Sequence, residues 1–218
     1  MTMTTTITNL ARLLQLASPA LPVGAYSYSQ GLEAAIEAGA VKDADSAARW
    51  IGDVLEFSLS GMDAPLLFIL LSEKSRQEEM NVLYLASRET AELRAETLQM
   101  GYSLCRLLEE FGLEDVPGGE VAFPTAYAFA ARAWGIEPRA ALEAYLWSWL
   151  ENQVMAAVKA VPLGQTAGQK ILLSLGERLA SVAERAATME NSERCNFAPG
   201  LAMFSSRHET QYSRIFRS

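Results

Sequence analysis

Side chains that commonly carry out catalysis or bind metal ions are scarce in this sequence of 218 residues. The chain has one histidine, His208, and two cysteines, Cys105 and Cys195. Structural zinc sites use four Cys or His ligands, catalytic zinc sites usually use three protein ligands, and a serine nucleophile needs a neighbouring base. We therefore predict no catalytic residues and no metal site. The two widely spaced cysteines favour a reducing compartment over a disulfide framework.

The charge balance excludes a further class of function. Eighteen basic and 26 acidic residues give a net charge of −8, whereas phosphate contacts in nucleic-acid binders need clustered Lys and Arg. Residues 1–8 lack the basic start and apolar core of a signal peptide. The most apolar run, residues 64–71, is far shorter than the ~20 residues of a membrane span. We expect a cytoplasmic protein that binds other proteins and has no nucleic-acid or membrane partner.

In four segments the residue types and spacing are not explained by helix packing alone. The first is residues 21–33 (LPVGAYSYSQGLE). A Pro/Gly loop here leads two tyrosines and two serines into a helix start, with Gly31 one turn in. Glycine inside a helix costs about 1 kcal/mol relative to alanine, so it usually marks close backbone approach. The spacing alone favours a helix cap with a tight helix crossing over a binding site.

The second segment is residues 89–101 (ETAELRAETLQMG), in which four of the first eight residues are charged. Glu89 and Glu92 can each pair with neighbours three to five positions along a helix. Such pairs stabilise a helix by a few tenths of a kcal/mol. The periodicity therefore favours a solvated helix face.

The third segment is residues 159–170 (KAVPLGQTAGQK). Its lone cation in an apolar run, Lys159, must reach water or find a partner. Pro162 breaks the helix, and the pairs Gly164/Gly168 and Gln165/Gln169 each repeat on one face of the next. The segment has two interpretations, a kinked and tightly crossed helix pair or a surface that binds a partner. Both remain open, and both can hold at once.

The fourth segment is residues 207–218 (RHETQYSRIFRS), which is basic and aromatic in an acidic protein. Arginine and aromatic residues are enriched in interface anchors. The interleaved Ile215 and Phe216 favour docking over a solvated basic tail. The preceding Pro199-Gly200 favours a tail that stays mobile until a partner orders it.

The elements that must position these segments are helices. Apolar residues recur at spacings of three and four, Gly or Pro interrupts them at helix-length intervals, and no run alternates with period two. The sequence predicts an all-α fold, a single compact bundle of about 8–10 helices over residues 1–218. Residues 1–8 are expected to be flexible and residues 188–218 to form the mobile, partner-ordered tail. Expected helices include residues 26–38, a helix stopped by Gly61, one capped by Asp63, and residues 87–111, 125–134, 138–160 and 165–187.

In this order, the four segments resemble the urease accessory protein UreF family. Residues 21–33 are similar to its L-P-[IV]-G-[AS]-[FY]-S-[YH]-S-x-G-L-E, with Gln30 where histidine is common. The other three are similar to E-T-x-E-L-R-x-x-[ST]-x-x-M-G, V-P-L-G-Q-x-x-G-Q and H-E-x-x-Y-S-R-L-F-R-S, with Ile215 for Leu. The resemblance spans nearly the whole chain. One departure is that residues 121–127 lack a histidine that the family often has, which puts a metal-ligand role of that segment in doubt.

The resemblance implies a non-enzymatic adaptor and chaperone for urease maturation. Proteins of this family are all-α and commonly dimeric. They bridge UreD (also called UreH) and the GTPase UreG, dock on apo-urease, and support GTP-dependent nickel insertion. The resemblance implies no tightly bound cofactor, since nickel is handled by the complex. An alternative is a GTPase-activating protein for UreG that uses Arg214 or Arg217 as an arginine finger.

The resemblance also points to candidate partner-binding residues, several of which have a structural alternative. The first set lies in the tail and comprises Arg214, Phe216, Arg217, Ser218, His208 and Tyr212. The second set comprises Tyr26, Ser29, Glu33, Lys159, Pro162, Gly164, Gln165 and Gln169. A third set, structural or partner-binding, comprises Gly24, Gly31, Glu89, Glu92, Arg94, Gly101 and Gly168.

Overall fold

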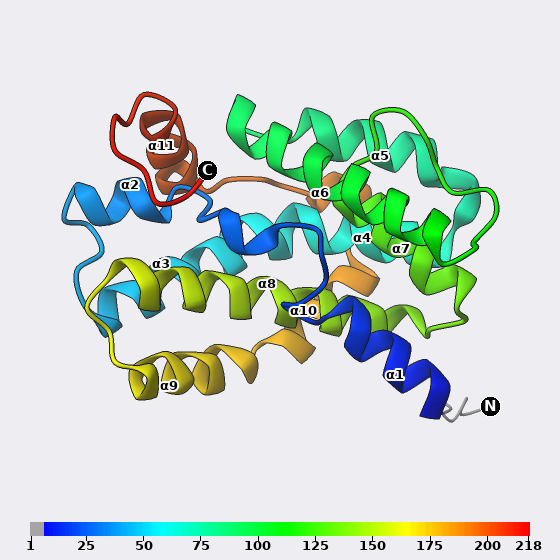
Figure 1. The fold of residues 1–218 in the computed structure, drawn as a ribbon, viewed down its shortest axis with the longest axis horizontal. Helices are drawn as coiled ribbons and strands as arrows, with labels where there is room; N and C mark the ends of the chain where they lie inside the picture. Colours follow the sequence, from blue (N-terminus) through cyan, green and yellow to red (C-terminus); the bar gives the residue numbers. More distant parts are fainter. Residues whose placement is uncertain (1–6) are drawn as a thin grey trace.

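A computed structural model describes residues 7–218 as an arrangement of α-helices, and no strand occurs among those residues (Figure 1). The expected all-α class is confirmed. The expected flexibility of residues 1–8 falls mostly on residues 1–6, which lie outside the described residues. The helices are α1 (Ile7–Leu16), α2 (Leu32–Glu37), α3 (Ala44–Val54), α4 (Ala64–Ser72), α5 (Gln77–Ala86), α6 (Ala91–Glu110), α7 (Phe123–Ala133), α8 (Pro138–Ala160), α9 (Gln165–Gly176), α10 (Leu179–Thr188) and α11 (Pro199–His208).

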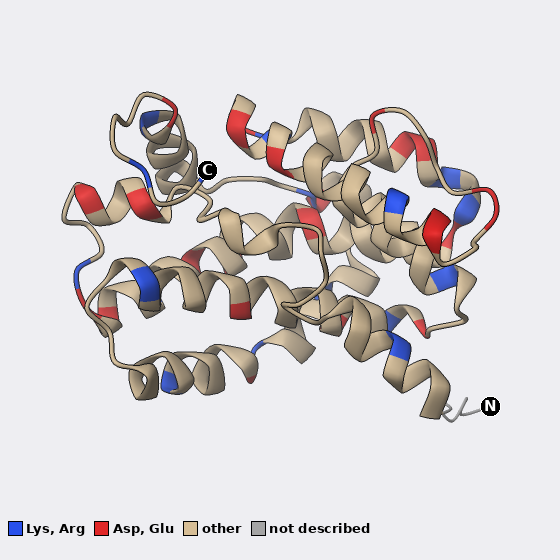
Figure 2. Cartoon of the chain, in the orientation of Figure 1, with Lys and Arg blue, Asp and Glu red and all other residues tan. Residues whose placement is uncertain are grey.

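The core forms where α4 packs against α7, α8 and α10. Almost every side chain of α7 is buried, and the hydroxyl of Tyr127 donates a 2.9 Å hydrogen bond to the Ala141 carbonyl of α8. Helix α4 carries no charged residue, and Figure 2 shows charged residues spread over the surrounding helices. This apolar centre fixes α6 and α8, on which the polar segments lie.

The predicted helix end at Gly61 is wrong, as is the predicted cap at Asp63. Helices α3 and α4 are joined by a π-helical stretch, Leu55–Asp63, into one helix from Ala44 to Ser72. The wider π turns leave the Phe57 and Gly61 carbonyls to accept hydrogen bonds from the Phe197 and Cys195 amides (3.2 and 3.1 Å). A Cβ at Gly61 would overlap the Cys195 carbonyl oxygen, so glycine serves close approach here.

This continuous helix is long and apolar enough to cross a membrane by length and composition alone. Its most apolar window has a mean hydropathy of 1.7, and 67% of that window is buried inside the protein. Such burial is typical of a core helix.

Three other predicted helices are divided or begin later than expected. In place of a helix over residues 26–38 the chain forms a 3-10 turn, Ala25–Ser27, and the short α2, because Gln30 and Gly31 adopt left-handed backbone conformations (φ 53° and 76°). Residues 87–111 begin helically only after Thr90, whose hydroxyl accepts a hydrogen bond from the Leu93 amide. Residues 165–187 divide into α9 and α10, whereas α8 has the predicted bounds.

The C-terminal residues differ most from expectation. After α10 the chain crosses the π-helical stretch, forms α11 against α2, and returns over the starts of α2 and α6 (Figure 1). The last residue, Ser218, is fully buried. In this structure the tail is packed against the body, which supplies hydrogen-bond partners for its backbone. That a partner orders the tail stays a prediction.

Candidate functional site

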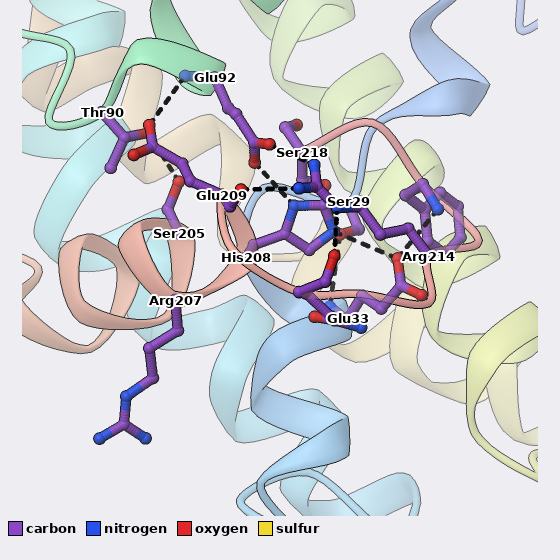
Figure 3. A network of polar contacts seen from close by, with 12 residues as sticks. Ser29, Glu33, Thr90, Glu92, Ser205, Arg207, His208, Glu209, Arg214 and Ser218 are labelled. Carbon is purple, nitrogen blue, oxygen red and sulfur yellow. Dashed lines mark hydrogen bonds and ion pairs between the residues drawn. The ribbon is translucent and has the colours of Figure 1, made fainter.

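Three helix ends meet beneath the tail. Glu33 lies in the first turn of α2, Glu92 in the first turn of α6, and His208 in the last turn of α11 (Figure 3). The approach of α11 to α2 depends on Gly31, because a Cβ there would lie 2.9 Å from the Ser205 amide nitrogen. We call this cluster, with Ser29, Glu96 and residues 209–218, the tail clasp.

Glu33 holds the tail by its backbone. Its two carboxylate oxygens accept hydrogen bonds from the amides of Ile215 (2.6 Å) and Phe216 (2.9 Å). Beside it, the amide and hydroxyl of Ser29 both donate to the Ser218 carbonyl oxygen (2.8 and 2.6 Å). All of these contacts are made to backbone atoms of the tail.

His208 bridges two carboxylates. Its Nδ1 lies 2.7 Å from Glu92 Oε2 and its Nε2 lies 3.3 Å from Glu33 Oε2, and its side chain is fully buried. Arg214 completes the cluster, since its Nη1 donates to the other oxygen of Glu92 (2.6 Å). The remaining guanidinium nitrogens of Arg214 donate to the carbonyls of Gln211 (2.8 Å) and Glu209 (2.7 Å).

Glu96 lies one turn below Glu92 on α6 and is buried. Its oxygens accept hydrogen bonds from Gln30 Nε2 and the Ser218 hydroxyl, both at 2.7 Å. Burial raises the pKa of the Glu96 carboxyl to about 7. Gln30 Oε1 in turn accepts from Trp149 Nε1 of α8 (2.8 Å). Glu96 therefore connects the tail to α6, and Gln30 extends the network from Glu96 to α8.

The tail also caps α6. Glu209 Oε1 accepts hydrogen bonds from the amides of Ala91 (2.9 Å) and Glu92 (3.3 Å), which have no partner within the helix. The hydroxyls of Thr90 and Ser205 lie 2.8 Å apart. A carboxylate at a helix start is also favoured by the helix dipole.

Phe216 anchors the tail and gives a partner to Lys159, the lone cation in the apolar run at the end of α8. Its ring is buried, and Lys159 Nζ lies 4.7 Å from the ring centroid. A cation over an aromatic face contributes about 0.5–2 kcal/mol, depending on its exposure to water. Lys159 therefore both reaches the surface and finds a partner.

Comparison with known proteins identifies the family. The family model for UreF matches residues 41–176. The chain belongs to the UreF family of urease accessory proteins. It is 56% identical to the urease accessory protein UreF of Azoarcus sp. (strain BH72), over 96% of this chain and 95% of that protein. It is 52% identical to the protein of the same name from Dechloromonas aromatica (strain RCB), over 98% and 99%.

In this UreF-family chain, the clasp brings together residues from three of the four segments. The predicted solvated face of residues 89–101 is wrong, because Glu92 pairs with the tail and Glu96 is buried. Several residues proposed to contact partners are buried in contacts between the tail and the body, and they comprise Ser29, Glu33, His208, Phe216 and Ser218.

Other candidate residues remain at the surface. Tyr26 is 73% exposed and shares a hollow of about 440 Å³ with Arg217, although residues 24–27 and the tail are far apart in sequence. Tyr212 and Ile215 are also exposed. A separate exposed group lies at the junction of α8 and α9 and comprises Pro162, Gly164, Gln165 and Gln169.

The remaining candidates lie outside the clasp. Gly101 and Gly168 allow close packing, because a Cβ at Gly101 would overlap the Val121 carbonyl oxygen and one at Gly168 would lie 2.7 Å from Val158 Cγ2. Gly24 adopts a left-handed conformation (φ 81°). Arg94 forms a surface ion pair with Glu120 (2.9 Å). Glu89 accepts a hydrogen bond from Asn196, which also contacts the π-helical stretch.

Sequence reasoning missed several residues of the clasp. Glu92, Glu96 and Met100 are spaced four residues apart, so they lie on one face of α6, and the neighbours of Glu96 on that face are buried. This spacing could have indicated that the Glu96 side chain points inward. Gln30 was noted only as a departure from the family pattern. No sequence signal pointed to the roles of Glu209, Ser205 or Trp149, because their partners lie more than 100 residues away.

The clasp is suited to holding a peptide segment. Its carboxylates already accept hydrogen bonds from the chain, and residues 7–218 contain no group of three His, Cys, Asp or Glu side chains arranged to hold a metal ion. What the clasp leaves exposed is a surface of aromatic, aliphatic and arginine side chains. This arrangement can position an interface.

Proposed function

We propose that this UreF-family protein is a non-enzymatic adaptor in urease maturation. It works in the cytoplasm as a dimer, bridges UreD and the GTPase UreG on apo-urease, and supports GTP-dependent nickel insertion. In this proposal the complex handles nickel, and this chain holds no cofactor. The observation that carries the proposal is the shared hollow of Tyr26 and Arg217, which joins the opening segment and the tail into one exposed surface.

The composition of this surface supports a protein partner. Tyrosine and arginine are the residue types that most often carry binding energy at interfaces. Tyr26, Tyr212 and Ile215 expose apolar area that burial by a partner would stabilise. The clasp beneath fixes the backbone of the tail, so less conformational entropy is lost on binding.

A second exposed surface supports the bridging role. Pro162, Gly164, Gln165 and Gln169 lie where α8 passes into α9, and Gly168 holds that crossing tight. An adaptor needs two surfaces on one rigid body. Helix α8 ends at this junction, and its Trp149 donates a hydrogen bond to Gln30 beside the clasp, so one helix connects the two surfaces. We propose that the two surfaces contact different members of the maturation complex.

The test is binding of UreD and UreG to purified variants. We expect Tyr26→Ala and Arg217→Ala to weaken at least one partner about 30-fold, the loss typical of an interface hot spot. Phe197→Ala is the matched control, because Phe197 is 70% exposed but lies on the segment crossing the π-helical stretch. Nickel content of urease matured with each variant should follow the binding loss. Unchanged binding in both variants would overturn the proposal.

The alternative activator function now depends on a single arginine. All three guanidinium nitrogens of Arg214 donate hydrogen bonds within the chain, whereas Arg217 lines the exposed hollow. An arginine finger accelerates GTP hydrolysis by about 10³–10⁵-fold. Hydrolysis by UreG measured with and without this chain separates the two functions. The adaptor leaves the rate within severalfold, and an activator raises it in a way that Arg217→Ala abolishes.

A further inference from the structure

The backbone of the tail fixes the position of Arg217. The Arg217 amide donates a hydrogen bond to the Ser27 carbonyl (2.8 Å), and the carbonyl of Ser218 accepts one from the Ser29 amide (2.8 Å). On the other side of Arg217, the Phe216 side chain is buried. The exposed side chain of Arg217 therefore projects from a backbone that is held on both sides.

Arg217 gives its hollow a positive charge. It is the only charged residue among the described residues that line this hollow of about 440 Å³. The remaining lining residues are apolar or uncharged and include Pro22, Gln99 and Ser103. Among residues 7–218, no carboxylate forms an ion pair with Arg217. The hollow therefore presents a guanidinium whose charge is not paired within the described part of the chain.

An anion complements such a hollow, and a carboxylate fits it best. A guanidinium presents a planar fork of donors that can bind a carboxylate through two hydrogen bonds. Phosphate groups of nucleic acids are bound by clusters of Lys and Arg, whereas the described lining of this hollow offers one cation. The chemistry therefore favours an Asp or Glu side chain of a protein partner.

An apolar hollow lies beside this cationic one. Tyr26, Leu21 and Val23 line both, so the two hollows are neighbours. The second hollow measures about 310 Å³, and Met155 on its wall is 45% exposed. Its only charged lining residue among those described is Glu151 of α8, which repels a carboxylate. An apolar side chain therefore fits the second hollow better than an acidic one.

We propose that the two hollows bind one segment of a protein partner, which places a carboxylate against Arg217 and an apolar side chain beside Met155. Tyr26 lines both hollows and contacts the segment between these two groups. Arg217 and Glu151 carry opposite charges, so they also fix the direction of the segment. The inference rests on the proposed adaptor function, because it names the chemistry that a partner brings to the Tyr26 surface.

Binding of UreD and UreG to purified variants tests the carboxylate. We expect Arg217→Gln to weaken one partner about tenfold or more at low salt, because it removes the charge. The loss should shrink at high salt, which screens a pair of charges. Arg207→Gln is the matched control, since Arg207 forms no ion pair among the described residues and extends away from the clasp (Figure 3). Equal affinities of Arg217→Gln and the unmodified chain would overturn the proposal.

An exchange of charges identifies the group on the partner. Arg217→Glu should bind that partner more weakly than Arg217→Gln does, because two carboxylates then repel each other. Each Asp and Glu on the surface of the partner is then replaced by Lys in turn. At least one replacement should bind Arg217→Glu more tightly than it binds the unmodified chain. If none does, no carboxylate faces Arg217 and the proposal is overturned.

Met155→Glu tests the apolar hollow. A second carboxylate beside Glu151 opposes burial of an apolar side chain, so we expect the same partner to bind about tenfold more weakly. Leu173→Glu is the matched control, because Leu173 is 71% exposed on α9 and lines neither hollow. Both positions are exposed, so both variants should fold. Equal affinities of the two variants would overturn the proposal.

Tyr26→Ala separates this inference from the proposed function. If Tyr26→Ala weakens binding while Arg217→Gln and Met155→Glu do not, a partner of other chemistry binds this surface, and only the inference fails. If none of the three variants changes binding, the proposed surface fails as well. Hydrogen exchange of residues 209–218 should be unchanged in Arg217→Gln, because its backbone contacts remain. A loosened tail in that variant would mean that Arg217 acts on docking of the tail, which contradicts the proposal.

Discussion

Helix α6 contacts two distant parts of the chain, and the two contacts have different chemistry. Near its start, Glu92 and Glu96 hold the tail through charged and polar hydrogen bonds. Further along, Gly101 lies directly against the backbone of residues 121–122. The first contact contains groups that bind protons and a segment that can leave. At Gly101 the second contact is made by close packing of two backbones without a charged group, so the first contact is the one suited to regulation.

The largest effect is expected at the contact made by shape. Gly101→Ala places a methyl group on the Val121 carbonyl oxygen, and backbone on both sides must move. Overpacking of this kind costs about 3 kcal/mol of the free energy of unfolding. Urea denaturation monitored by circular dichroism measures it. Gly118→Ala is the control, because a Cβ there meets nothing within 4 Å. Equal stability of the two variants would mean that the contact is not close-packed.

The charged contact should give a smaller and more local loss. Glu33→Gln keeps the shape of the side chain but weakens its bonds to the Ile215 and Phe216 amides. Hydrogen bonds to a charged group contribute about 1.5–3 kcal/mol, so we expect about 2 kcal/mol. Limited proteolysis should cleave within residues 209–218 first. Glu37→Gln, on the exposed side of the same helix, should behave as the unmodified chain. Cleavage throughout the chain would instead mean that Glu33 stabilises the whole fold and not only the docking of residues 209–218.

The contact made by shape was more predictable from sequence than the charged one. Helical spacing and glycine positions gave the all-α class, the bounds of α8 and the helix ends at Gly39, Gly112 and Gly135, because these depend on local chemistry. Gly61 failed as a stop, since a crossing segment more than 130 residues later takes up its carbonyl. The packing of the tail against the body was not predicted, for the same reason. Periodicity cannot show that Glu33 and Glu92 lie where residues 209–218 return.

A third prediction concerns Glu96 and the pH dependence of stability. Burial raises the pKa of this carboxyl from its usual value near 4.5 to about 7. A raised folded-state pKa means that its contribution to stability is full below about pH 4.5 and is lost as pH rises toward 7. Glu96→Gln should remove this slope and raise the free energy of unfolding at pH 8 by about 1 kcal/mol relative to the unmodified chain. Parallel stability curves for the two chains from pH 5 to 8 would contradict it.

The smallest effect is expected at Arg94, two residues from Glu92 in the same motif. Its ion pair with Glu120 lies at the surface, with 41% and 68% of the two side chains exposed. Exposed pairs of this kind contribute less than about 0.5 kcal/mol, because water and salt screen the charges. Arg94→Ala should therefore leave unfolding and tail protection unchanged, and Glu120→Ala should match it. A large loss of protection of the tail from hydrogen exchange in Arg94→Ala would contradict this. It would mean that the whole motif holds the tail, and that the contact of Glu92 with the tail is not sufficient.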